Sequence, residues 1–82
     1  MSEVTFYGAD WCGDCRRSKA LLNGLGVEFE IRDVEASADA AKEAQNISGR
    51  TNIPVIVFKD GVNLVEPSDA DLLSALKERG LA

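Results

Sequence analysis

Two cysteines, Cys12 and Cys15, are the residues of this chain whose type and spacing could do chemistry. The thiolate form of cysteine is both a nucleophile and a metal ligand, and a close pair of cysteines can exchange a disulfide with a substrate. A bridge between these two closes a very short loop, so it would constrain the unfolded chain little and stabilise the fold little. The pair is therefore a candidate for redox chemistry or metal binding rather than a structural crosslink.

The rest of the composition narrows the chemistry that this pair can support. The chain has no histidine, which excludes Ser–His and Cys–His nucleophilic pairs and every histidine-ligated metal site. A four-cysteine zinc site needs a second pair that this chain lacks, so we expect no metal site within one chain. Two chains together could still hold an iron–sulfur cluster, and the pair could also be two unreactive thiols in a core.

The cysteines lie between a predicted strand and a predicted helix. Residues 4–7 are β-branched and aromatic, which indicates a buried strand. Residues 15–25 carry apolar side chains at helical spacing, and Gly26 ends this predicted helix. Free backbone N–H groups and the helix dipole at a helix start favour a thiolate, so we expect Cys12 to be the nucleophile. Cys15, about one turn further on, is the expected resolving thiol in a more buried position.

The next two segments predict a second strand and a second helix, which give the order strand–helix–strand–helix for the N-terminal half of the chain. Residues 27–32 alternate apolar with charged residues, which predicts a half-buried strand near a sheet edge. Ser37 is placed to cap a second helix that ends at Gly49. The face of this helix expected to pack consists of Ala40, Ala41, Ala44 and Ile47. A helix between two neighbouring strands implies a right-handed crossover, so the first two strands should pair in parallel.

The remaining segments predict a hairpin and a final helix. Residues 53–58 are a continuous apolar run that favours a central strand buried on both faces, with Pro54 tolerated near its start. An Asp-Gly pair at residues 60–61 predicts a hairpin turn that returns through residues 62–65. Ser68 is the expected cap of the last helix. The order β-α-β-α-β-β-α predicts an α/β fold with a mixed four-stranded sheet and helices on both faces.

Length and charge bound the class of protein and its partners. The 82 residues allow one domain, over residues 1–82. Nine basic residues against fourteen acidic ones give a net charge of −5, which disfavours binding to nucleic acid or to anionic membrane surfaces. The sequence contains no recognisable targeting segment and no apolar run of membrane-spanning length. We therefore expect a cytoplasmic protein with no nucleic-acid or membrane partner. We also expect it to act as a monomer.

The chain resembles the glutaredoxin family of the thioredoxin-fold superfamily over nearly its whole length. The residues that carry the resemblance are 4–7, 11–15, 52–55 and 66–69. Within the family, the chain is most similar to the short actinobacterial mycoredoxins, which use mycothiol in place of glutathione. The resemblance implies a thioredoxin-like fold and a thiol–disulfide oxidoreductase in which Cys12 attacks and Cys15 resolves.

The resemblance also implies the co-substrate and the residues around it. No cofactor would be bound permanently; mycothiol or glutathione would recharge the protein, and its substrates would be disulfide-containing proteins or mixed disulfides. Ile53-Pro54 would be a cis peptide facing the cysteines. The residues implied to contact the thiol are Trp11, Asn52, Ile53, Pro54, Ser68 and Asp69.

Departures from the family pattern keep alternatives open. Gly13-Asp14 stands between the cysteines where glutaredoxins commonly have Pro-Tyr, and the Trp11-Cys12-Gly13 run is closer to thioredoxin usage. The same chemistry could then be recharged by a thioredoxin reductase. Two alternatives from other classes are a dimeric iron–sulfur cluster carrier and a redox-inert interaction domain.

Overall fold

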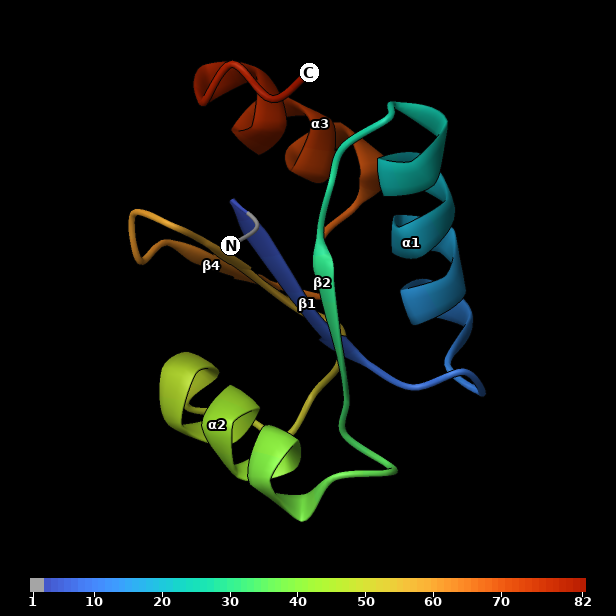
Figure 1. Ribbon diagram of the computed structural model, residues 1–82, viewed down its shortest axis with the longest axis vertical. Helices are drawn as coiled ribbons and strands as arrows, with labels where there is room; N and C mark the ends of the chain where they lie inside the picture. The colour runs from blue at the N-terminus through green and yellow to red at the C-terminus, as the bar shows by residue number, and fades with distance from the viewer. Residues whose placement is uncertain (1–2) are drawn as a thin grey trace.

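The computed structural model describes residues 3–82 and has the predicted order of elements (Figure 1). These elements are β1 (Val4–Gly8), α1 (Gly13–Gly24), β2 (Glu30–Asp33), α2 (Ala38–Ser48), β3 (Val55–Phe58), β4 (Asn63–Val65) and α3 (Asp69–Glu78). Residues 1–2 of the predicted domain lie outside the described range. The order confirms the predicted β-α-β-α-β-β-α fold.

The four strands form one mixed sheet in the order β2-β1-β3-β4. The strand β1 pairs in parallel with β2, placing Phe6 opposite Ile31, and antiparallel with β3, placing Phe6 opposite Ile56. The hairpin pairs β3 with β4 in an antiparallel arrangement, with Ile56 opposite Leu64. These pairings confirm the mixed sheet, the central position of β3 and the edge position of β2.

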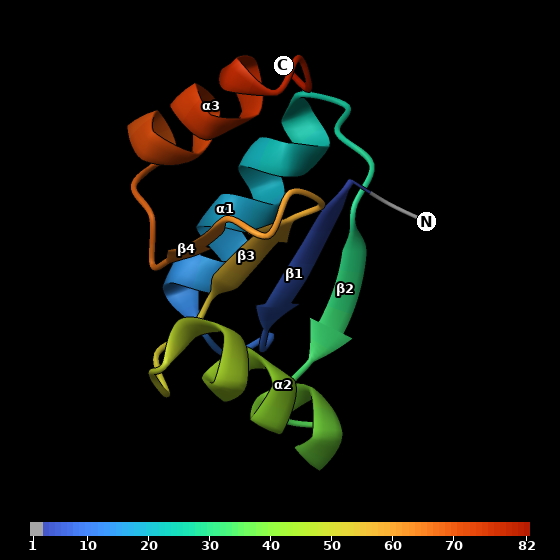
Figure 2. The ribbon, with the colours of Figure 1, turned by 90° about the vertical axis from the view of Figure 1, so that its left-hand side faces the viewer.

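Helices cover both faces of the sheet. In Figures 1 and 2, α1 and α3 lie together over one face, and α2 lies over the other. Side chains alternate along a strand, so Phe6 and Ile56 belong to the core cluster that also contains residues of α1 and α3. Their neighbours Tyr7 and Val55 belong to a smaller cluster with the alanines of α2. Each helix layer is therefore held by its own core cluster.

The local signals at the helix ends act as expected. The Ser37 Oγ accepts a hydrogen bond from the Ala40 N–H at 3.2 Å, and the Ser68 Oγ accepts one from the Asp71 N–H at 3.1 Å. Gly49 closes α2 in the left-handed region with φ of 73°. These contacts satisfy backbone groups that each helix would otherwise leave unpaired.

Two burial predictions are wrong. The strand predicted over residues 27–32 spans only Glu30–Asp33, and Ile31 is 53% exposed because β2 has a neighbouring strand on one side alone. Val27 and Phe29 fill the core before the strand starts. Ile47, expected on the packed face of α2, is 39% exposed because it lies in the last turn of that helix.

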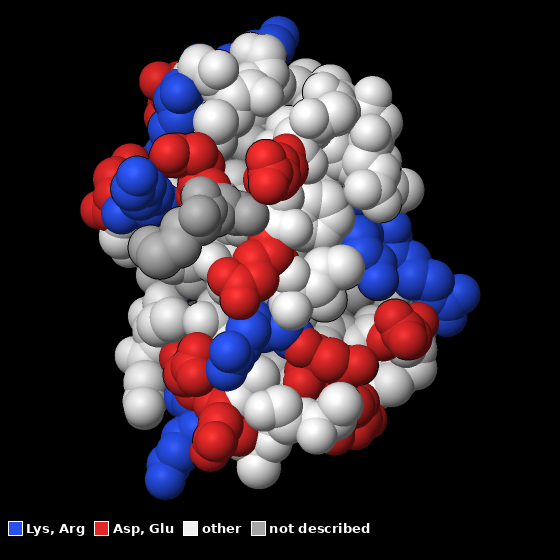
Figure 3. Space-filling model, viewed as in Figure 1, with Lys and Arg blue, Asp and Glu red and all other residues white. Residues whose placement is uncertain are grey.

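Charged side chains of both signs share the surface. Figure 3 shows lysine and arginine interspersed with aspartate and glutamate over the face seen in Figure 1. Within residues 3–82, no helix is long and apolar enough to cross a membrane.

Candidate active site

Cys12 occupies the N-cap position of α1. The helix begins at Gly13, two residues before the predicted start, and the Cys12 Sγ accepts a hydrogen bond from the Cys15 N–H at 3.3 Å. The turn from β1 into the helix is closed by the Cys12 N–H, which donates to the Ala9 carbonyl at 3.2 Å. The structure therefore places this sulfur at the N-terminal end of α1, with its lone pair toward the first turn of the helix.

Cys15 lies in the core beneath the first turn of α1 and is 1% exposed. Burial, followed by the side-chain hydrogen bond with Cys12, raises the pKa of the Cys15 thiol to about 12. A Cβ placed on Gly8 would lie 2.9 Å from the Cys15 Sγ, so the missing side chain at the end of β1 makes room for the buried sulfur. Both cysteines are free thiols, and Cys12 is the more exposed of the two.

The loop before β3 faces the cysteine pair. The Ile53-Pro54 peptide bond is cis, as the resemblance implied. The Cys12 thiol donates a long hydrogen bond, 3.9 Å from sulfur to oxygen, to the Ile53 carbonyl. The structure therefore brings Ile53 and Pro54 to the sulfur that is half-buried at the helix cap.

Trp11 precedes Cys12, and its exposed side chain is held by a residue of the loop after β2. Its side chain is 64% exposed, and its Nε1–H donates to the Glu35 carboxylate at 2.6 Å. Asp33 shapes the loop that carries Glu35, because its Oδ1 accepts hydrogen bonds from the Glu35 and Ala36 N–H groups. The indole is thus tied to the loop between β2 and α2. No sequence signal pointed to Glu35, since the fold alone brings it to Trp11.

The start of α3, where Ser68 and Asp69 lie, is joined to α1 by an arginine. The Arg17 Nε lies 3.3 Å from Asp69 Oδ1, and the Arg17 Nη2 donates to the Pro67 carbonyl at 3.0 Å. The same guanidinium lies 3.7 Å from Asp14 Oδ1. Arg17 therefore joins the start of α3 to α1. Ser68 itself is engaged as the helix cap.

Asn52 turns toward the loop after β4 rather than toward Cys12. Its Nδ2 donates to the Glu66 carboxylate at 3.3 Å, and the Glu66 N–H donates to the Pro54 carbonyl at 2.9 Å. Glu66 has φ of 48°, a conformation that glycine adopts more readily. These two bonds tie the loop after β4 to the cis peptide, so the two loops form one surface.

The site offers two sulfurs and few other ligands for a metal. Within residues 3–82, no three His, Cys, Asp or Glu side chains are grouped so that they could hold a metal ion. A shared site between two chains would have to take its protein ligands from this cysteine pair. Within one chain, the geometry supplies a partly exposed thiol at Cys12 and a buried thiol at Cys15, three residues further on.

The comparisons with known proteins agree with this geometry. Residues 4–62 match the family model for glutaredoxin. The chain is 32% identical over 79 residues to mycoredoxin 1 of Corynebacterium glutamicum, covering 94% of this chain and 96% of that protein. It is 36% identical over 80 residues to glutaredoxin 3 of Escherichia coli, covering 98% and 92%. The crystal structure of a glutaredoxin from Archaeoglobus fulgidus superposes with a TM-score of 0.78 at 26% identity, covering 99% of this chain and 86% of that one.

Proposed function

The chain belongs to the glutaredoxin family of thiol–disulfide oxidoreductases, and from that premise we propose that it reduces disulfides through Cys12 and Cys15. The observation that carries the proposal is the unequal pair of thiols. Cys12 is half-buried at a helix cap, where its sulfur accepts the Cys15 N–H, whereas Cys15 is buried with its pKa raised to about 12. This asymmetry supports attack by Cys12 and resolution by Cys15.

The first step is attack by the Cys12 thiolate on a substrate disulfide. The substrate S–S bond breaks, one substrate sulfur leaves as a thiolate that takes up a proton, and the other stays joined to Cys12 as a mixed disulfide. The Cys15 N–H in the first turn of α1 contacts the Cys12 sulfur that attacks. The carbonyl of Ile53 and the indole of Trp11 border the place where the substrate sulfur arrives.

The second step releases the substrate. The Cys15 thiol gives its proton to the departing sulfur or to water and attacks the Cys12 Sγ, so the mixed disulfide breaks and a Cys12–Cys15 disulfide forms. The two electrons that reduce the substrate thus come from the cysteine pair. Burial holds the Cys15 proton in place until the mixed disulfide supplies an acceptor beside it.

We further propose that a small thiol restores the reduced pair. One thiol molecule opens the Cys12–Cys15 disulfide, and a second displaces the first from Cys12 as a symmetrical disulfide. Glutaredoxins use glutathione or mycothiol in this role, and the two relatives named above represent both. The residues we assign to thiol contact are Trp11, Asn52, Ile53, Pro54, Ser68 and Asp69.

Three donors presented separately to the oxidised protein test the recharging step. The donors are glutathione, mycothiol, and NADPH with thioredoxin reductase, and the readout is the thiol count or the loss of NADPH. We expect a small thiol to reduce the protein, and the better of the two identifies the co-substrate. Reduction by the reductase alone would make the protein a thioredoxin-type donor, with Gly13-Asp14 as the reason. Visible colour with iron bound by two chains would instead indicate a cluster carrier.

A further inference from the structure

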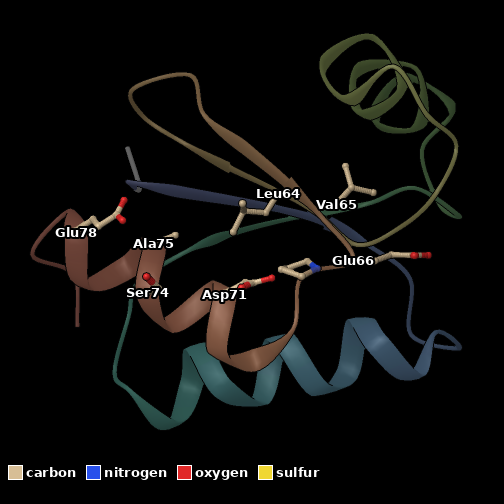
Figure 4. Close-up of a pocket in the computed structure, with 8 residues that line it drawn as sticks. Leu64, Val65, Glu66, Asp71, Ser74, Ala75 and Glu78 are labelled. Carbon is tan, nitrogen blue, oxygen red and sulfur yellow. The ribbon is translucent and has the colours of Figure 1, made fainter.

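A groove lies between the edge strand β4 and the helix α3, beside the proposed active site. Its volume is about 350 Å³, and Leu64, Pro67 and Ala75 give it an apolar lining. Figure 4 shows Leu64 pointing from β4 toward α3, where Asp71, Ala75 and Glu78 follow one another along the helix. The groove thus has an apolar floor and a polar wall.

The polar wall is negatively charged. Asp71 and Glu78 lie two helical turns apart, and among the described residues the lining contains no lysine or arginine. Asp71 has no ion pair within residues 3–82. Glu78 lies 3.8 Å from Arg79, whose closer contacts are Asp60 at 3.1 Å and the ring of Phe58 at 4.2 Å. The charge of the wall is therefore available to a cation.

One end of the groove adjoins the loops at Cys12. Glu66 and Pro67 line that end. The Glu66 N–H donates to the Pro54 carbonyl at 2.9 Å, and the Pro67 carbonyl accepts from Arg17 at 3.0 Å. A polypeptide that presents a disulfide to Cys12 can therefore continue past these loops into the groove.

We propose that this groove receives an extended segment of the protein substrate that carries lysine or arginine near the reacting disulfide. This proposal rests on the proposed function. It adds that the groove would favour protein substrates with basic residues near the disulfide. As a sheet edge, β4 offers backbone N–H and C=O groups to an added strand. Asp71 and Glu78 are separated by about 10 Å along the helix axis, which is about the length of three extended residues. Two long basic side chains on one face of such a segment reach both carboxylates.

Two peptide disulfides test the proposal. They have the same sequence except that one carries two lysines beside the disulfide and the other carries glutamines. Single-turnover reduction by the reduced protein is followed by mass spectrometry at low and high NaCl concentration. The variants are Asp71→Asn with Glu78→Gln, and a control of equal charge change, Asp39→Asn with Glu28→Gln. Asp39 is a matched choice because it too lies in the first turn of a helix.

The wild type should reduce the lysine peptide about three- to tenfold faster than the glutamine peptide at low salt, as expected for two exposed ion pairs. The groove variant should lose this preference, the control should keep it, and added salt should weaken it. Equal rates for the two peptides in the wild type, or a preference retained by the groove variant, would overturn the proposal.

A binding measurement separates this proposal from the proposed function. The lysine peptide with its cysteines replaced by serine should shift the backbone amide signals of Leu64 and Ala75 in the NMR spectrum of the wild type. Such shifts without reduction of either peptide would overturn the proposed function and support the groove. Reduction of both peptides without such shifts would overturn the groove and support the function.

Discussion

Cys12 and Cys15 are chemically identical residues that the fold places in different environments. One caps a helix at the surface, and the other lies in the core with its pKa raised to about 12 by burial and by Cys12. The difference arises because Cys12 precedes the first helical residue, whereas the Cys15 side chain packs into the core cluster between α1 and the sheet. This difference in environment supports the proposed order of reaction, and the reactivity of each thiol can be measured without a substrate.

Selective alkylation tests this difference. In the reduced folded protein at pH 7, we expect iodoacetamide to modify Cys12 well before Cys15, because Cys15 is buried and protonated. Peptide mass spectrometry reports the site. The control is the same reaction in urea, where both thiols should react at similar rates. Equal rates in the folded protein would contradict the assigned environments.

The raised pKa of Cys15 also predicts a loss of stability at high pH. The native thiol keeps its proton up to about pH 12, whereas the unfolded thiol loses it near its ordinary value of 9.0. The free energy of unfolding should therefore fall as pH rises from about 9 toward 12. Urea unfolding of the reduced protein should show a smaller fall in the Cys15→Ala variant. Tyr7, whose pKa is also raised by burial and by Glu43, is present in both proteins and cancels in the comparison.

A buried hydroxyl on α1 predicts an unusual gain in stability. Ser18 is fully buried, and its Oγ has no hydrogen-bond partner within residues 3–82. Replacing it in the Ser18→Ala variant should raise the free energy of unfolding by about 1 kcal/mol, because an unpaired buried polar group is removed.

The matched control for that change is Ser48→Ala. The Ser48 Oγ donates to the Ala44 carbonyl at 2.8 Å and accepts from the Arg50 N–H at 3.1 Å. Losing these bonds should lower the free energy of unfolding by about 1 kcal/mol. Urea unfolding gives both values, and a destabilised Ser18→Ala variant would show that the hydroxyl is satisfied in solution.

At the scale of elements, the last residue of β1 sets how closely the strand and α1 approach. A Cβ on Gly8 would lie 2.6 Å from Phe6 Cε1 and 2.9 Å from Cys15 Sγ. The Gly8→Ala variant should lower the free energy of unfolding by about 1–3 kcal/mol through overpacking. It should also expose Cys15 to alkylation as the sulfur is displaced.

Gly24→Ala is the control for this prediction. Gly24 ends α1, and a Cβ there would have nothing within 4 Å. Alanine should therefore be neutral or slightly stabilising at this position. A Gly8→Ala protein as stable as the wild type, measured by urea unfolding, would contradict the close approach of β1 to the cysteine.

The elements also show what local sequence can and cannot predict. The caps at Ser37 and Ser68 and the end of α2 at Gly49 were predictable because each depends on contacts within one turn. The exposure of Ile31 was not, although the edge position of its strand was predicted, since exposure depends on what packs over that face of the strand. The cis state of Pro54 came from the family resemblance, because local preference favours trans.

The site follows the same division. The cysteine pair and the start of the helix lie within a few consecutive residues, so Cys12 and Cys15 could be identified from the sequence alone. The bond from Trp11 to Glu35 joins residues 24 positions apart, and only the fold brings them together. The ion pair of Arg17 with Asp69 likewise links α1 to α3 and has no local signal.

At the scale of the whole molecule, large exposed apolar side chains among residues 3–82 are few. The large ones are Trp11, Leu25, Ile31, Ile47 and Val62, and they belong to different elements or loops. A stable dimer usually needs a contiguous apolar patch. The charged surface of both signs and the net charge of −5 further favour separate molecules.

We therefore expect the reduced, metal-free protein to sediment as a monomer near 8.8 kDa. The measurement is analytical ultracentrifugation at neutral pH, with the visible spectrum recorded on the same sample. A species of twice this mass with visible absorption would support the cluster carrier, and a colourless dimer would show that the apolar residues pair across an interface.

The central claim is that Cys12 attacks and Cys15 resolves, and trapping of the intermediate tests it most directly. The reduced wild type, Cys12→Ser and Cys15→Ser proteins are each mixed with a peptide disulfide, quenched in acid and weighed by intact mass spectrometry. We predict that the wild type loses two hydrogen atoms as its internal disulfide forms, that Cys15→Ser carries half of the peptide as a mixed disulfide, and that Cys12→Ser is unchanged. Reduction of the peptide by Cys12→Ser at the wild-type rate, or a Cys15→Ser protein without the adduct, would contradict the claim.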